Sequence, residues 1–224
     1  MDKRFIAILA GIIIILGGIF VVTKNSGDNG NGGGNSNAQA TSHISGEGQA
    51  NVTFIEYGDF QCPVCQVYYG PLKEIKAKYA KDIFFQFRHL PLTSIHQNAF
   101  AAARAAEAAS RQGKFWEMHD KLYENQSSWA SSSNPLSVFK GYAQAIGLDV
   151  SKFEKDYASE TVNDAINADV AAFEKTGRPQ STPSFFLNGK PIENTELTDP
   201  STGSPSVDKI SALIDKAIAE SKQQ

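Results

Sequence analysis

The feature that most constrains this chain is a cysteine pair set between a strand-like run and a helix-like run. Both cysteines of the sequence stand in one motif, Cys62-Pro63-Val64-Cys65, which follows the β-branched and aromatic run 52–57. The first turn of a helix offers unpaired N–H groups and a positive dipole end, and both stabilise a thiolate. Pro63 suits that turn because its missing N–H would be unpaired there. We therefore predict that Cys62 is an exposed nucleophile of low pKa and that Cys65 is the buried resolving thiol.

The N-terminus carries an unbroken apolar run. Residues 5–22 are all apolar or glycine, and as a helix they would span about 27 Å, enough to cross a bilayer. Lys3 and Arg4 before the run favour a cytoplasmic N-terminus, with the remainder outside. A cleavable signal peptide is the alternative, because Ala38-Gln39-Ala40 has the form of a cleavage site, although it lies far beyond the run.

These observations divide the chain into four parts. We expect a cytoplasmic head over residues 1–4, a transmembrane anchor over 5–22 and a flexible Gly/Asn/Ser linker over 23–46. Residues 47–224 form one folded domain, which the anchor places on the extracytoplasmic face of the cell membrane. The net charge of −3 and the lack of a basic run argue against nucleic acid as a partner. No dimerisation segment is visible, so we expect a monomer.

The pattern of elements predicts an α/β fold with a large helical insertion. A helix separates strand 52–57 from strand 83–88, although Gly70-Pro71 should bend or interrupt it. The next strand signal comes only at 184–187, and Asn188-Gly189 turns it into a hairpin. A crossover needs only a dozen or so residues. The helical stretch of about 94–177 is therefore an inserted subdomain.

In this arrangement the sequence resembles the DsbA-like thiol–disulfide oxidoreductases of the thioredoxin superfamily, and among them the membrane-anchored branch. The resemblance covers residues 47–224 and rests on three segments: EYGDFQCPVC at 56–65, RHLPL at 88–92 and TPSFF at 182–186. It implies a thioredoxin-like fold with the helical insertion. The dipeptide Pro63-Val64 departs from the Pro-His of the best-known members, which bears on the strength of the oxidant rather than on the class of chemistry.

The resemblance also assigns roles to three residues outside the motif. Pro183 is expected to follow a cis peptide bond and to face the cysteines, so that the backbone of Thr182 can pair with substrate. Glu56 stands where this superfamily keeps a buried carboxylate that exchanges a proton with Cys65. The alternative for Glu56 is a charge at a strand end that reaches solvent. We expect Asp59 to be an exposed turn residue.

Three functions fit these residues. The first is an oxidase that introduces disulfide bonds into reduced exported proteins through Cys62 and Cys65. The second is a reductase or isomerase with the same motif, and the third is a membrane-tethered holdase. The constellation of Cys62, Glu56 and Pro183 favours the oxidase, because a holdase would not need it.

The cofactor and partner expectations follow from the same residues. A zinc site at the CxxC pair would need paired histidines, which are lacking, so we expect no metal. We expect no cofactor besides the redox-active disulfide of Cys62 and Cys65. Turnover then needs a reoxidising partner, and the resemblance implies a membrane thiol oxidase of the DsbB-like or VKOR-like kind.

Overall fold

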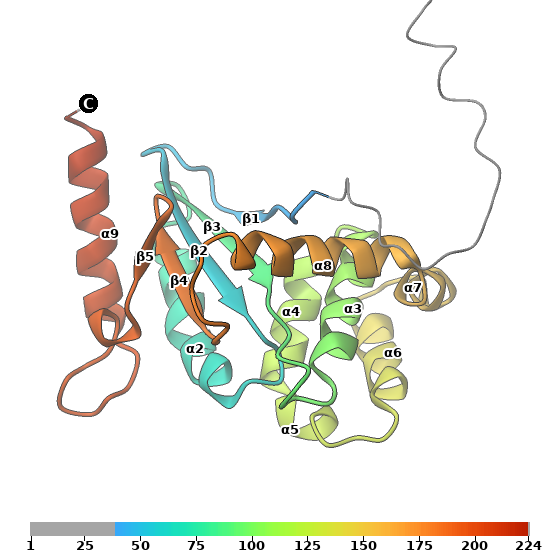
Figure 1. Ribbon diagram of the computed structural model, residues 1–224. Coiled ribbons are helices and arrows are strands. Elements are labelled where there is room, and N and C mark those ends of the chain that lie inside the picture. The colour runs from blue at the N-terminus through green and yellow to red at the C-terminus, as the bar shows by residue number, and fades with distance from the viewer. Residues whose placement is uncertain (1–38, 224) are drawn as a thin grey trace, which may run out of the picture. The chain divides into compact units, whose positions relative to one another are not determined.

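The computed structural model describes residues 39–223 (Figure 1). The predicted head at 1–4, the anchor at 5–22 and most of the linker lie outside these residues. Within the described part of the chain, no helix has both the length and the apolar character needed to cross a membrane.

A five-stranded mixed sheet forms the centre of the domain, in the order β1-β3-β2-β4-β5. Strand β2 pairs in parallel with β3 and antiparallel with β4, and the outer strands β1 and β5 are antiparallel to their neighbours. Asn188 and Gly189 both have positive φ between β4 and β5, which is the turn that an Asn-Gly pair favours. The strands are β1 (His43–Ser45), β2 (Val52–Gly58), β3 (Ile83–His89), β4 (Ser184–Leu187) and β5 (Lys190–Ile192).

The helices fall into a pair that belongs to the sheet and a group inserted between β3 and β4. Helix α2 connects β2 to β3 and continues through Pro71, so of the predicted bend or interruption at Gly70-Pro71 the interruption is wrong, and the bend stays a prediction. Helices α3 to α8 form the insertion and bear out its predicted position (Figure 1). The helices are α2 (Pro63–Lys78), α3 (Ala99–Ser110), α4 (Phe115–Glu124), α5 (Gln126–Trp129), α6 (Pro135–Ala145), α7 (Val150–Tyr157), α8 (Glu160–Glu174) and α9 (Val207–Ser221).

The two faces of β2 pack against different layers. Phe54 lies in a core with residues of α2 and α9, such as Ile75 and Ile214. Tyr57 points the other way and packs against Phe173 of α8. This alternation is the one predicted for the strand. It places Glu56, on the same face as Phe54, beneath α2 and near the cysteines.

The predicted linker, residues 23–46, includes residues that belong to the folded domain. Strand β1 pairs with β3, in the register His43 to Phe87. Ahead of it the buried Thr41 donates from both its backbone N–H and its hydroxyl to the Asp169 carboxylate, at 2.7 and 2.6 Å. Residues 41–45 therefore belong to the folded domain. A three-residue strand beside a Gly/Asn/Ser stretch gives too short a pattern to recognise in the sequence.

Candidate active site

The cysteine motif begins helix α2 as predicted. Cys62 is the N-cap residue, with an extended backbone at φ −67° and ψ 123°, and Pro63 opens the helix. Both cysteines are free thiols in this structure. Cys65 is fully buried, and Cys62 keeps 5% of its surface exposed. The prediction of an exposed Cys62 is therefore wrong, because contacts with Thr182 and Gln126 help to cover the residue, although Cys62 remains the more accessible of the pair.

The two thiols differ in acidity in the predicted direction. A hydrogen bond from the Cys65 thiol, against the opposing effect of burial, lowers the pKa of Cys62 to about 6. The Thr182 hydroxyl and the backbone N–H groups of Cys65 and Val64 stabilise the thiolate further. Burial raises the pKa of Cys65 well above its ordinary value, and the neighbouring Cys62 and Glu56 add to this effect. At neutral pH Cys62 is therefore the thiolate and Cys65 the thiol.

The segment before β4 faces Cys62. The peptide bond between Thr182 and Pro183 is cis, which confirms that prediction. The Cys62 Sγ lies 3.4 Å from the Thr182 carbonyl oxygen, to which it donates when it is protonated. The Thr182 hydroxyl is buried and has no hydrogen-bond partner among the described residues, so it is available to donate to the Cys62 thiolate. Thr182 thus contacts Cys62, 120 positions away in sequence.

Glu56 lies behind the cysteines and not at the solvent. Its surface is 3% exposed, which contradicts the alternative of a strand-end charge. Burial raises the pKa of Glu56 to about 8, against the attraction of Lys76. At neutral pH the carboxyl is therefore largely protonated, and it can give a proton to Cys65 or accept one.

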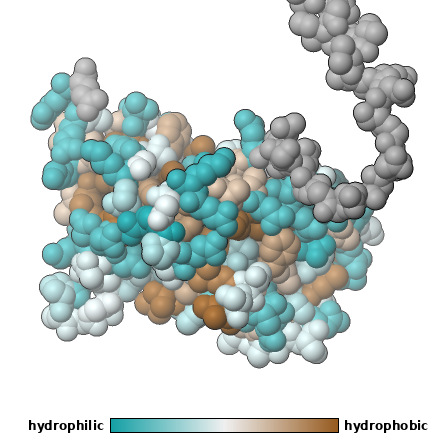
Figure 2. All heavy atoms as spheres, in the orientation of Figure 1, coloured by the Kyte–Doolittle hydropathy of each residue, from teal (hydrophilic) through white to brown (hydrophobic). Residues whose placement is uncertain are grey.

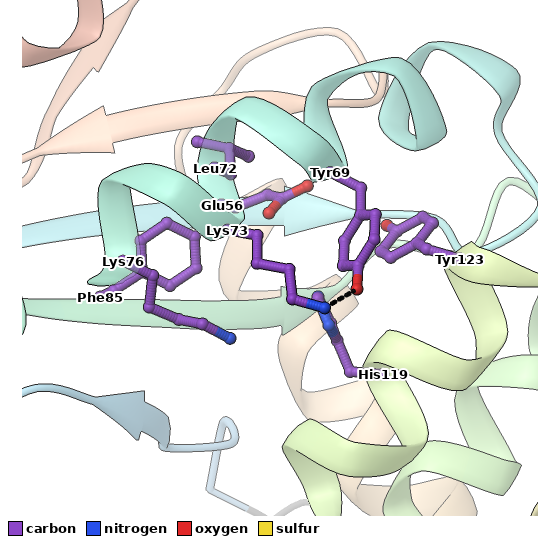
Figure 3. Close-up of a pocket in the computed structure, with 8 residues that line it drawn as sticks. All are labelled: Glu56, Tyr69, Leu72, Lys73, Lys76, Phe85, His119 and Tyr123. Carbon is purple, nitrogen blue, oxygen red and sulfur yellow. Dashed lines mark hydrogen bonds between the residues drawn. The ribbon is translucent and has the colours of Figure 1, made fainter. Parts of the chain in front are cut away.

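A cavity of about 10 Å³ adjoins Glu56, close to the smallest space that holds one water molecule. Side chains of β2, α2, β3 and α4 enclose it, and Figure 3 shows His119 and Tyr123 of α4 on one side of it. Lys73 donates to the Tyr69 hydroxyl at 2.8 Å (Figure 3). Burial lowers the pKa of His119 to about 4, so this imidazole is neutral near pH 7. The surface of this cavity is mostly apolar, in keeping with the burial that raises the pKa of Glu56.

Asp59 shapes the loop before the motif and is not the exposed residue that we predicted. It is 1% exposed. One carboxylate oxygen accepts from the Gln61 N–H at 2.8 Å, and the other accepts from the Leu92 N–H at 2.9 Å and pairs with the His96 imidazole at 2.7 Å. Its backbone carbonyl accepts from the Cys62 N–H at 3.1 Å. Asp59 therefore joins the motif to the loop that follows β3.

The helical insertion also holds the motif, through amides that sequence reasoning missed. The Gln126 amide donates to the carbonyls of Phe60 and Cys62, at 2.7 and 3.0 Å. The Gln61 side chain accepts from the Asn98 N–H at 2.6 Å and donates to the Ala130 carbonyl at 2.7 Å. Each bond joins segments more than 30 positions apart, so no local pattern could have shown it.

Exposed apolar side chains surround the motif. Val64, Val67 and Ile95 are 48%, 57% and 70% exposed. Figure 2 shows apolar surface at the lower edge of this face, where Figure 1 places the start of α2. A groove of about 390 Å³ lies on one side of Pro63 and a second groove of about 470 Å³ lies on the other. An extended peptide could lie along these surfaces with a cysteine near Cys62.

The described residues contain one cluster of candidate metal ligands, and it does not include the cysteine motif. Their one cluster of at least three candidate ligands contains His43, His89 and Glu107, and neither cysteine belongs to it.

Comparisons with known proteins agree with this architecture. A family model described as thioredoxin matches residues 38–216. The Na(+)/H(+) antiporter NhaA 1 of Mycolicibacterium gilvum is 37% identical over 155 residues, which is 66% of this chain and 23% of the antiporter. The chain thus spans about a quarter of the length of the curated relatives that it matches.

Solved structures of similar fold complete the comparison. Oxidised BdbD from Bacillus subtilis superposes with a TM-score of 0.67 at 22% identity, over 81% of this chain and 97% of BdbD. The thiol-disulfide exchange protein alpha-DsbA2 from Wolbachia pipientis gives 0.64 at 16% identity, over 78% and 86%. These comparisons confirm the predicted thioredoxin-like fold.

Proposed function

The chain belongs to the thioredoxin family, and we propose that it is an oxidase that introduces disulfide bonds into exported proteins. The observation that carries this proposal is the low pKa of Cys62, about 6, at a sulfur that touches the cis-proline segment. A stabilised thiolate favours the reduced enzyme and so makes its disulfide more oxidising.

The size of this effect can be bounded. The pKa of Cys62, about 6, lies about one unit below neutral pH. One unit is worth about 1.4 kcal/mol, which for a two-electron couple corresponds to about 30 mV. The pair is thus a stronger oxidant than an unperturbed dithiol, and the rest of its potential depends on the stability of the disulfide form.

The reaction is a pair of thiol–disulfide exchanges. A substrate thiolate attacks Sγ of Cys62 in the oxidised enzyme, and Cys65 leaves as a thiolate that takes a proton. The protonated Glu56 carboxyl supplies that proton, because it is buried beside Cys65 with a pKa of about 8. The second substrate thiolate then attacks the mixed disulfide, and Cys62 leaves. The substrate loses two electrons, and the cysteine pair gains them.

The site also accounts for how substrate binds. The backbone of Thr182 offers a carbonyl beside the reacting sulfur, and an extended substrate segment can pair with it. Val64, Val67 and Ile95 contribute apolar surface on either side. Such a surface suits unfolded chains of varied sequence, because contact with apolar side chains demands little specificity.

The setting of the enzyme completes the proposal. The apolar run 5–22 with its basic head anchors the chain in the cell membrane, with the thioredoxin-like domain on the extracytoplasmic side, where disulfides persist. A membrane thiol oxidase of the DsbB-like or VKOR-like kind reoxidises Cys62 and Cys65. The enzyme works as a monomer, and the exchange needs no cofactor besides the disulfide of Cys62 and Cys65.

The test is the direction of exchange. The oxidised full-length protein should refold a reduced, disulfide-requiring substrate stoichiometrically without added oxidant, and Cys62→Ser should abolish this. Cys65→Ser should instead accumulate mixed disulfides through Cys62, since the internal resolving thiol is gone. A reduction potential near or below about −270 mV, with reduction or reshuffling as the main activity, would replace the oxidase with a reductase or isomerase. Prevention of aggregation that survives loss of both cysteines would indicate a holdase.

A further inference from the structure

Three side chains with metal-binding groups converge in the interior of the domain. His43 lies on β1, His89 ends β3 and Glu107 lies on α3. One candidate ligand atom from each lies within 4.8 Å of the other two. His89 is fully buried, and Glu107 is 4% exposed. The tertiary fold, and no local motif, assembles this cluster.

Both imidazoles present the same nitrogen to the same oxygen. His89 Nε2 lies 2.8 Å from Glu107 Oε1, and His43 Nε2 contacts that oxygen as well. The second carboxylate oxygen accepts from the Ser110 hydroxyl at 3.2 Å. Phe115 stacks on His43 with the ring planes 4° apart, which orients the ring. The cluster is therefore arranged around one point, with its ligand atoms held by further contacts.

Hydrogen bonds alone leave this cluster incompletely satisfied. A carboxylate only accepts, so each ring must carry its proton on Nε2. The Nδ1 atom of His89 is then a buried lone pair, and it has no partner among the residues that the structure describes. No contact with a described residue therefore fixes the tautomer of His89 at Nδ1, and the ring can move its proton there and present the Nε2 lone pair to an ion.

We propose that His43, His89 and Glu107 bind a divalent transition-metal ion, with zinc as the ion that fits best. Two imidazole nitrogens and one carboxylate oxygen, completed by water, form a well-known zinc ligand set. The ion takes the place of the Nε2 protons, which move to Nδ1, so that each ring binds the ion as a neutral imidazole. Bond lengths of about 2.0–2.2 Å at tetrahedral angles place the ligand atoms roughly 3.3 Å apart. The cluster therefore opens by less than about 1 Å when the ion enters.

The surroundings allow that opening. The His43 side chain is 12% exposed, which gives the ion a way in from solvent. Strand β1 has three residues and lies at the edge of the sheet, so it can shift more easily than β3. Once bound, the ion joins β1 to β3 and α3. It fastens the segment that follows the linker to the domain.

The experiment measures zinc binding by the full-length chain with Cys62→Ser and Cys65→Ser, because the active-site thiolates would themselves bind zinc. After treatment with chelator and its removal, titration calorimetry with Zn²⁺ should show one ion per chain. Co²⁺ in place of Zn²⁺ should give visible absorption bands of tetrahedral intensity. A hundred-fold excess of Zn²⁺ over its dissociation constant should raise the unfolding midpoint by about 5–10 °C.

The variants decide where the ion binds. His43→Gln is the safest, since this side chain is partly exposed on a short edge strand, and it should weaken zinc binding at least about ten-fold. His89→Gln should do the same. His96→Gln is the matched control, because His96 also pairs with a buried carboxylate, and it should leave zinc affinity unchanged. An absence of stoichiometric zinc binding overturns the proposal, as does binding that His43→Gln leaves intact.

Discussion

Glu56 and Glu107 are both buried glutamates, yet their environments move the carboxyl pKa in opposite directions. Burial dominates at Glu56, which has Lys76 as its attracting cation, and the pKa rises to about 8. Burial also acts on Glu107, but hydrogen bonds with His43 and His89 outweigh it and hold the pKa below its ordinary range. The comparison teaches that partners, and not depth, decide whether a buried carboxyl keeps its proton.

This difference matches two different uses. A carboxyl that holds its proton near neutral pH can exchange it with Cys65, as the proposed oxidase requires. A carboxylate held ionised between two imidazoles is a structural link or a metal ligand. Both residues lie in the same small domain, so each serves as a control for the other.

The largest expected effect on stability comes from removing Glu107, the glutamate that is ionised. Glu107→Ala leaves the buried imidazole of His89 and the partly buried imidazole of His43 without their acceptor, and we expect a loss of about 3–5 kcal/mol in the free energy of unfolding. Urea denaturation at pH 7 with chelator present measures it. Glu117→Ala is the control, since Glu117 pairs with Lys114 at the surface and should cost at most about 1 kcal/mol. A loss below about 1 kcal/mol for Glu107→Ala would mean that this carboxylate does not hold the cluster.

Glu56→Gln, in contrast, should increase the free energy of unfolding at neutral pH. Because the folded-state pKa of Glu56 is raised from 4.5 to about 8, the folded protein binds a proton that the unfolded chain has lost. The stability associated with this proton is present below about pH 4.5 and is lost as the pH rises through 8. Glu56→Gln should therefore stabilise the domain by about 3 kcal/mol at pH 7, and the gain should vanish near pH 4.

The measurement is the pH dependence of unfolding for both proteins in the oxidised form. A constant difference between pH 4 and 9 would show that Glu56 titrates normally. In the oxidase assay the same variant should slow exchange, because Cys65 loses its nearby proton donor. A variant that is more stable but slower would separate the catalytic role of Glu56 from a structural one.

The sequence predicts some of these features and misses others for a physical reason. The cysteine motif, the Asn188-Gly189 hairpin and the placement of Glu56 on the inner face of β2 depend on neighbouring residues, and the structure bears them out. Asp59 carries no local sign of burial, because its partners come from a loop after the next strand.

The same limit applies to the contacts that join distant elements. Gln126 reaches the motif from 64 positions away, and His43 reaches Glu107 from a segment whose composition reads as linker. Such contacts arise only when separate elements pack. Periodicity and turn chemistry therefore predict the fold of this chain and the reacting thiols, while the residues that hold the thiols in place need the tertiary structure.

The next effect in size concerns the thiols. The pKa of Cys62 is lowered from 9 to about 6, so its stabilising contribution to the reduced protein is fully present above pH 9 and is lost as the pH falls through 6. At pH 7 it amounts to about 1.4 kcal/mol. Alkylation of the reduced protein should therefore show a midpoint near pH 6 at Cys62, and Cys65 should react far more slowly. Comparable rates at the two thiols would contradict the assignment.

The smallest expected effect tests why Glu56 and Glu107 differ. Lys76 is the attracting charge at Glu56, and burial lowers its own pKa while its Nζ lies 3.9 Å from the centre of the Trp116 ring. Lys76→Met should therefore raise the pKa of Glu56 further, by less than about one unit, since a partly buried cation acts through a moderate effective dielectric. Isotope-edited titration of the Glu56 carboxyl measures this shift.

Lys73→Met is the matched control for that titration. Lys73 also lines the cavity beside Glu56, but its ammonium pairs with Asp120 and Glu124 and donates to Tyr69. Its charge is therefore compensated locally, and its removal should leave the Glu56 pKa unchanged. Equal shifts in the two variants would mean that Glu56 responds to the total charge of the cavity wall. No shift in either would leave burial as the sole cause of the raised pKa, and the contrast with Glu107 would then rest entirely on the two imidazoles.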